Sequence, residues 1–176
     1  MLISRRTHFT GRVVTIDVDE VRLPNGHEAT FEVVHHPGGA AAVAVDANRR
    51  VCLLRQYRHA IGDWIVELPA GKLDTAEGPL VTAQRELAEE AGLTARTWRP
   101  LGHSISSPGV FTEFVHLFLA TDLGQAALQR EHGEVLEPFW VPLDEAVQNV
   151  IDGRWSDAKT VVGLVRAGAC LRRGDP

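Results

Sequence analysis

The sequence has few of the features that mark secreted, membrane or fibrous proteins. It contains two cysteines, one methionine and one tyrosine in 176 residues, with no C-x-x-C pair. So few cysteines exclude a disulfide framework, and Cys52, within an apolar run, and Cys170 are expected to be reduced thiols. No apolar run reaches the length of a signal sequence or a membrane span. We therefore expect a cytoplasmic protein with no membrane partner.

The sequence also lacks an excess of positive charge. Its formal net charge is -5, and 44% of its residues are hydrophobic. This composition is ordinary for a globular protein, and a negative charge gives no general attraction to nucleic acid. Any phosphate-bearing substrate must be held by local cations and bound metal. A small molecule is therefore a better expectation than a polymer.

What the sequence does contain is one acidic segment, residues 71–93, which reads GKLDTAEGPLVTAQRELAEEAGL. Gly78 and Pro79 are typical of a helix start, and Gly92 is typical of a helix end. Between them an apolar stripe recurs at helical spacing and comprises Leu80, Ala83, Leu87 and Ala91. We expect a short helix that packs this stripe on a core.

Two glutamates flank the apolar stripe. At about 100° per residue, Glu86 and Glu90 lie about 40° apart on one side of the helix. Their like charges repel, and more strongly when partly desolvated, so a cation is the natural compensation. Hard oxygen ligands with open water positions suit Mg²⁺ or Mn²⁺ rather than Zn²⁺. The alternative is a solvated acidic face with an Arg85–Glu89 surface pair.

The full spacing of the segment decides between these alternatives. It fits G-x5-E-x7-R-E-U-x-E-E-x-G-U, in which U is aliphatic, at every fixed position. This pattern is the Nudix box, and the chain resembles Nudix pyrophosphohydrolases. The resemblance implies that metal binds to the carbonyl or carboxylate oxygens of Ala70, Glu86, Glu89 and Glu90. It also implies that Arg85 orients the box glutamates, and that Glu77 stabilises the loop or holds a further metal. The implied cofactor is Mg²⁺, with Mn²⁺ as a substitute.

The segments around the box predict an α/β fold. Apolar runs bounded by turn residues predict strands at 12–18, 21–23, 29–35, 40–46, 51–55, 64–68, 98–104, 114–120 and 137–142. Helices are predicted at 143–152 and 157–172. The resemblance implies the Nudix α/β/α sandwich with a mixed sheet, and the first third of the chain predicts a small N-terminal antiparallel sheet.

We divide the chain into an N-terminal strand region, 1–38, and a Nudix domain, 39–176. The resemblance implies a homodimer in which the N-terminal strands are exchanged. The sequence itself is equally compatible with a monomer that carries an extra sheet.

Three regions outside the box are similar to the ADP-ribose pyrophosphatase branch of the family. They are 54–58 with 64–71, the Pro108 loop sixteen residues after Gly92, and 157–160. Guanidinium groups suit phosphate oxygens, and Trp64 is suited either to stacking on a base or to a dimer contact. The substrate contacts that follow from this similarity are Arg55, Arg58, Trp64, Glu67, Pro108 and Glu113.

A general base must also activate the attacking water. In this branch the base is a carboxylate from a loop before the last strand, here residues 130–137. By its distance from Trp140 we choose Glu134, with Glu131 and Glu137 as competitors. Glu113 is a further candidate for metal or substrate contact.

These observations lead to one principal hypothesis, which is Mg²⁺-dependent hydrolysis of ADP-ribose to AMP and ribose 5-phosphate, extending to other nucleoside diphosphate sugars. An enzymatic alternative is a nucleotide-sugar hydrolase of the GDP-mannose type. An alternative of another class is a sensor that binds ADP-ribose without hydrolysing it. The complete set of box acids argues against the sensor, because binding alone does not require them.

Overall fold

The computed structural model describes residues 1–73, 77–127 and 135–173. The chain divides into two compact units. The first comprises Met1–Gly38 with Ile105–Phe114, and the second comprises Gly39–Ser104 with Val115–Pro176. Within the described part of the chain, no helix is both long and apolar enough to cross a membrane.

The first unit contains an antiparallel three-stranded sheet in the order β1 (Leu2–Thr10), β2 (Thr15–Arg22) and β3 (Glu28–His35). The predicted turn between β2 and β3 is present, with Gly26 at a φ of 87°. The prediction of two strands at 12–18 and 21–23 was wrong, since β2 is continuous, and β1 was missed. The sequence of β1, LISRRTHFT, lacks the strict alternation of apolar and polar residues that reveals a half-buried strand, and every residue of β1 is exposed.

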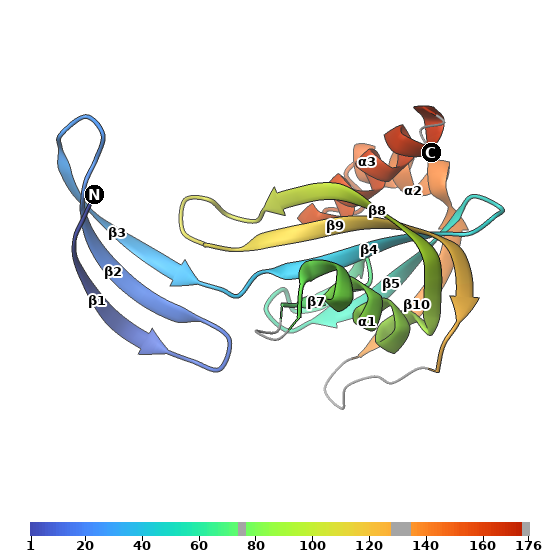
Figure 1. Cartoon of the computed structure of the whole chain (residues 1–176), viewed down its shortest axis with the longest axis horizontal. Coiled ribbons are helices and arrows are strands. Elements are labelled where there is room, and N and C mark those ends of the chain that lie inside the picture. The colour runs from blue at the N-terminus through green and yellow to red at the C-terminus, as the bar shows by residue number, and fades with distance from the viewer. Residues whose placement is uncertain (74–76, 128–134, 174–176) are drawn as a thin grey trace. The chain divides into compact units, whose positions relative to one another are not determined.

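The second unit is built around a mixed seven-stranded sheet (Figure 1). Its main path runs β10 (Leu136–Pro142), β5 (Arg50–Arg58), β4 (Gly39–Val45), β9 (Phe114–Gln125) and β8 (Leu93–Ile105). The short strands β6 (Asp63–Glu67) and β7 (Ala70–Lys72) pair with β5 and β4. Strand β4 runs parallel to β9 and antiparallel to β5 and β7.

Helices cover both faces of this sheet. Ala41, Val43 and Val45 of β4 face a core that includes α2 (Leu143–Ile151) and α3 (Ala158–Arg173). Ala42 and Ala44 face the opposite side and pack with Leu87 of α1 (Pro79–Ala91). All seven residues of β4 are buried, as expected for a strand covered on both faces. The prediction of an α/β/α sandwich with a mixed sheet and a separate N-terminal antiparallel sheet is confirmed.

Helix α1 begins and ends at the predicted residues. Pro79 occupies its first turn, and Gly92 follows it with a φ of 66°, a left-handed conformation that glycine adopts without strain. The amide of Gly92 donates to carbonyl oxygens of the last turn. The apolar stripe is shorter than predicted, because Leu80 is 38% exposed whereas Ala83 and Leu87 are fully buried. Glu86 and Glu90 are thus carried on a helix whose inner face is firmly packed.

His116 of β9 provides a test of how the second unit responds to pH. Its ring lies 5.9 Å from that of His103 in β8. Burial, and then the charge of His103, lower the pKa of His116 below 6.5. The unfolded chain therefore binds a proton at a higher pH than the folded chain does, and stability should fall as the pH drops through about 6.5.

We predict that the free energy of unfolding decreases between about pH 7.5 and about pH 5.5, and that His116→Gln flattens this dependence. Urea denaturation at several pH values measures it. Asp19 and Glu67 have lowered carboxyl pKa values, so their protonation reduces stability only at a more acidic pH than this range. An unchanged slope in the variant would show that another group controls stability near neutral pH.

Candidate active site

The site begins where the box helix meets strand β7. Glu86 of α1 is 9% exposed, and its carboxylate lies directly against Gly71. A Cβ atom added to Gly71 would overlap the side chain of Glu86. A glycine is therefore needed at this position so that a carboxylate can approach the backbone of the strand.

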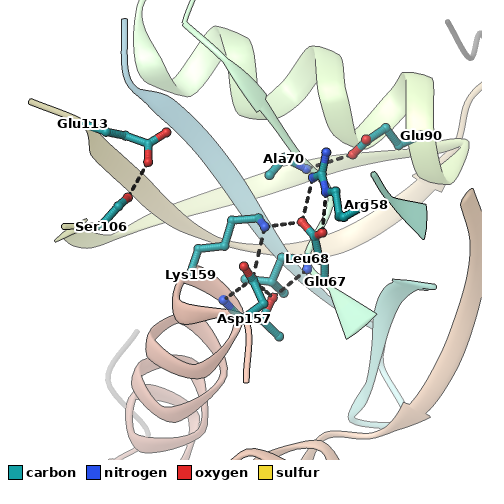
Figure 2. A network of polar contacts seen from close by, with 10 residues as sticks. Arg58, Glu67, Leu68, Ala70, Glu90, Ser106, Glu113, Asp157 and Lys159 are labelled. Carbon is teal, nitrogen blue, oxygen red and sulfur yellow. Dashed lines mark hydrogen bonds and ion pairs between the residues drawn. The ribbon is translucent and has the colours of Figure 1, made fainter. Parts of the chain in front are cut away.

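Glu90 occupies the next turn of α1 and is more deeply buried, with 2% exposure. Its Oε2 atom accepts a hydrogen bond of 2.8 Å from the backbone N–H of Ala70 (Figure 2). This bond fixes a negatively charged group beside the residue whose carbonyl was expected to bind metal. The structure thus brings Ala70, Glu86 and Glu90 together where α1 packs against β7.

Arg85 forms ion pairs with three acids of the box. Its guanidinium lies 3.1 Å from Glu77, 2.9 Å from Glu86 and 2.9 Å from Glu89. Burial lowers the pKa of Arg85, but the hydrogen bonds to Glu77 and Glu89 and the charge of Glu86 raise it by more, so the pKa lies above its ordinary value. The arginine stays charged and holds several carboxylates close together.

The resulting donor set suits a hard divalent cation. Carboxylate oxygens from adjacent turns of one helix lie beside the backbone of β7, in the cradle that Gly71 leaves open. In residues 1–73, 77–127 and 135–173, no group of three or more acidic, histidine or cysteine side chains has the geometry of a metal site. Arg85 provides a physical reason, because it takes up carboxylate oxygens of Glu86 and Glu89.

A second charged network joins β5, β6 and α3. Glu67, the last residue of β6, is 1% exposed and accepts hydrogen bonds of 2.6 and 2.8 Å from Arg58. Lys159 of α3 also donates to Glu67 and lies 3.1 Å from Asp157 (Figure 2). Burial raises the pKa of Glu67, but the two cations lower it more, so the net shift is downward. Arg58 and Glu67, both expected to contact substrate, are here partners of each other.

Arg55 and Trp64 form a separate contact on the exposed part of the β5–β6 hairpin. The guanidinium carbon of Arg55 lies 4.4 Å from the centre of the Trp64 ring, which is the geometry of a cation–π contact. Tyr57 approaches Trp64 edge-on, with ring centres 6.0 Å apart. Arg55 also lies 3.6 Å from Glu137. The two predicted substrate contacts are therefore adjacent to one another.

The other predicted contacts belong to different parts of the chain. Pro108 and Glu113 are in the first unit, where Glu113 accepts a hydrogen bond from Ser106 and lies 3.0 Å from His36. Glu134, the chosen general base, and its competitor Glu131 lie outside the described residues. A cavity of about 830 Å³ lies at Val45–Arg49 and Thr121–Gly124, and none of the predicted site residues that the structure describes lines it.

Sequence reasoning missed Thr160 as a member of this region. Its hydroxyl accepts a hydrogen bond of 2.9 Å from Leu68 N–H and donates one of 2.6 Å to Asp157. The segment 157–160 was noted only for its similarity to the ADP-ribose pyrophosphatase branch. The signal that was available is the spacing of Asp157 and Thr160, which is typical of an aspartate that caps a helix start.

Comparison with known proteins identifies the family. A model of the NUDIX domain matches residues 35–162. The chain is 39% identical to an ADP-ribose pyrophosphatase of Mycobacterium tuberculosis, over 95% of this chain and 82% of that protein. It is also 39% identical to a methanol dehydrogenase activator of Bacillus methanolicus, over 89% of this chain and 85% of that protein. The chain belongs to the Nudix family.

A solved structure agrees with this assignment at the level of the fold. It is described as an ADP compounds hydrolase, and it matches with a TM-score of 0.85 and 22% identity over 99% of this chain and 95% of that chain. The predictions of a Nudix pyrophosphohydrolase, and of similarity to ADP-ribose pyrophosphatases within the Nudix family, are confirmed by the family match and by the relatives. Nudix membership supports dependence on a divalent cation.

The cradle at Gly71 can be tested directly. We predict that Gly71→Ala weakens Mn²⁺ binding at least about tenfold, because the new methyl group must displace the carboxylate of Glu86. Isothermal titration calorimetry in the absence of substrate measures the affinity. The matched control is Gly78→Ala, because a Cβ atom at that position meets nothing within 4 Å. Equal Mn²⁺ affinity of the two variants would show that Glu86 does not need the cradle.

Proposed function

We propose that this protein hydrolyses the diphosphate bond of ADP-ribose to give AMP and ribose 5-phosphate, with Mg²⁺ as the cofactor and Mn²⁺ as a substitute. The observation that carries this proposal is the placement of Glu86 and Glu90 against Gly71 and Ala70. The 39% identity to an ADP-ribose pyrophosphatase over 95% of the chain supports the choice of substrate.

The metal would be held by the Ala70 carbonyl and the carboxylates of Glu86, Glu89 and Glu90, with Glu77 as a further ligand. When bound there, a divalent cation supplies charge neutralisation for a diphosphate and makes a coordinated water more acidic. Arg85 orients the glutamates through its contacts with Glu77, Glu86 and Glu89. Its permanent positive charge also limits their mutual repulsion before a cation binds.

Substrate contacts come from side chains with exposed polar or aromatic surface. The Arg55–Trp64 pair offers a guanidinium and an aromatic face to a phosphate or a base. Arg58 is held in place by Glu67, and its side chain is 41% exposed, so part of it is available to a ligand. We assign Pro108 and Glu113 to the same role. Glu134 is the proposed general base, with Glu131 and Glu137 as the competing residues.

We further propose that residues 1–38 form a strand region that is exchanged in a homodimer, and that residues 39–176 form the Nudix domain. Support comes from large apolar side chains on the three-stranded sheet, since Phe9 is 53% exposed and Phe31 is 42% exposed. Covering such side chains with a partner subunit would remove apolar surface from water, which is favourable. Light scattering that detects only monomer would contradict this assembly.

The net charge of -5 favours a small substrate over nucleic acid. We also propose that the protein is cytoplasmic.

The substrate is tested by product analysis with purified protein and Mg²⁺. The panel contains ADP-ribose, GDP-mannose, NADH, diadenosine polyphosphates and nucleoside triphosphates. We predict release of AMP and ribose 5-phosphate from ADP-ribose at the highest kcat/KM of the panel. Preference for GDP-mannose would retain the mechanism and support the alternative substrate. Tight binding of ADP-ribose without turnover of any compound would instead identify a sensor.

A further inference from the structure

Residues 68–70, which lead from β6 into β7, form backbone hydrogen bonds with three different elements. Leu68 N–H donates to the Thr160 hydroxyl of α3 at 2.9 Å, and Pro69 carbonyl accepts from Ala42 N–H of β4 at 2.9 Å. Ala70 N–H donates to Glu90 of α1 at 2.8 Å. Three successive residues are therefore held by the helix layer on one face of the sheet, by the sheet itself and by the helix on the other face.

The attachment to α3 is a closed ring of polar contacts. Thr160 donates its hydroxyl proton to Asp157, and Asp157 also accepts from the backbone N–H of Thr160 at 3.0 Å. Lys159 links Asp157 to Glu67. Glu67 and Leu68 are consecutive in the chain, so the ring returns to its starting point. Because the ring passes through two neighbouring residues of the chain, it fixes both the position and the direction of this backbone.

The side chain of Leu68 is held by the same face of α3. Leu68 is 1% exposed, and Thr160 is fully buried. One turn beyond Thr160, a Cβ atom on Gly163 would lie 2.6 Å from Leu68 Cδ1, so the glycine leaves the space that this leucine fills. Residues three apart lie on one face of a helix. Helix α3 therefore holds Leu68 in two ways: Thr160 binds the backbone N–H of Leu68, and Gly163 leaves room for the Leu68 side chain.

We propose that Thr160 is a positioning residue for the metal site. It acts through Leu68 N–H, two residues before Ala70, and so sets where the Ala70 carbonyl lies relative to Glu90 on the far side of the sheet. Asp157 orients the Thr160 hydroxyl, and the Lys159–Glu67–Arg58 contacts keep the ring closed. This proposal rests on the proposed function only in assigning Ala70 to the metal site.

The test compares Thr160→Val with Thr160→Ser in the full chain. Valine keeps the shape but removes the hydroxyl, which leaves the buried Leu68 N–H without its acceptor, whereas serine keeps the hydroxyl. We expect Thr160→Val to weaken Mn²⁺ binding about tenfold without substrate, and to lower kcat for ADP-ribose more than it raises KM. Amide exchange at Leu68 should accelerate relative to that at Leu53, in the centre of the sheet. Thr160→Ser should restore Mn²⁺ affinity to within about threefold of wild type.

The matched control is Val150→Ala in α2. Val150 belongs to the same buried cluster as Leu68, so truncating it lowers stability through a cavity while every contact of the ring remains. We expect a lower melting temperature with unchanged Mn²⁺ affinity. If Thr160→Val accelerates exchange at Leu68 but binds Mn²⁺ as the wild type does, Thr160 is merely structural and the proposal is wrong.

If Thr160→Val does not fold, Asp157→Asn becomes the deciding variant. It preserves size but weakens the acceptor of the Thr160 hydroxyl proton. Weaker Mn²⁺ binding together with faster Leu68 exchange supports the proposal, and unchanged Mn²⁺ affinity overturns it. A wild-type protein that binds Mn²⁺ but leaves ADP-ribose intact would contradict the proposed substrate alone, since Mn²⁺ affinity and amide exchange at Leu68 are both measured without substrate.

Discussion

The repulsion between glutamates crowded on one helix is the constraint on which the rest of the site depends. Glu86 and Glu90 are both nearly buried, where like charges repel more strongly than in water. The protein offsets this repulsion with the Arg85 guanidinium and with the backbone N–H of Ala70. These partners stabilise the acids, and they also hold the oxygens near the place where a cation would complete the compensation.

The small residues of the sheet allow this arrangement. Strand β4 is made almost entirely of alanine and valine after Gly39, and it is buried along its whole length. Ala42 and Ala44 let α1 approach one face, while Ala41, Val43 and Val45 face the core under α2 and α3. Gly71 of β7 likewise allows close packing, because the absence of a side chain leaves room for the carboxylate of Glu86. Close packing of backbone and acid is thus a consequence of residue size at a few positions.

Much of the second unit could be predicted from local sequence. Gly78, Pro79 and Gly92 mark the ends of α1 by their own conformational preferences, and the structure agrees with each. The pairing of β4 with β5 also follows from two apolar runs around a polar turn. The box itself identified the Nudix family because its spacing is long and specific. These features are all determined by residues close together in the chain.

What the sequence could not reveal depends on distant contacts or on weak local signals. The hydrogen bond between Leu68 and Thr160 joins residues 92 positions apart, and no periodicity marks it. Strand β7 has three residues, too few for a pattern, and β1 is exposed throughout. Arg58 and Glu67 were each predicted to contact substrate, and the prediction did not include the salt bridge between β5 and β6 that joins them. Cross-strand pairing of this kind requires a register that composition does not specify.

The most direct test of the account is the binding of Mn²⁺ to wild-type protein and to Glu90→Gln, followed by electron paramagnetic resonance. The glutamine retains an oxygen that can accept from Ala70 N–H, so circular dichroism should show an unchanged fold. We predict that the wild type binds Mn²⁺ and that the variant binds it at least about tenfold more weakly, because one charged ligand is lost. Equal affinity in the two folded proteins would contradict the claim that the buried glutamates of α1 form a divalent-cation site.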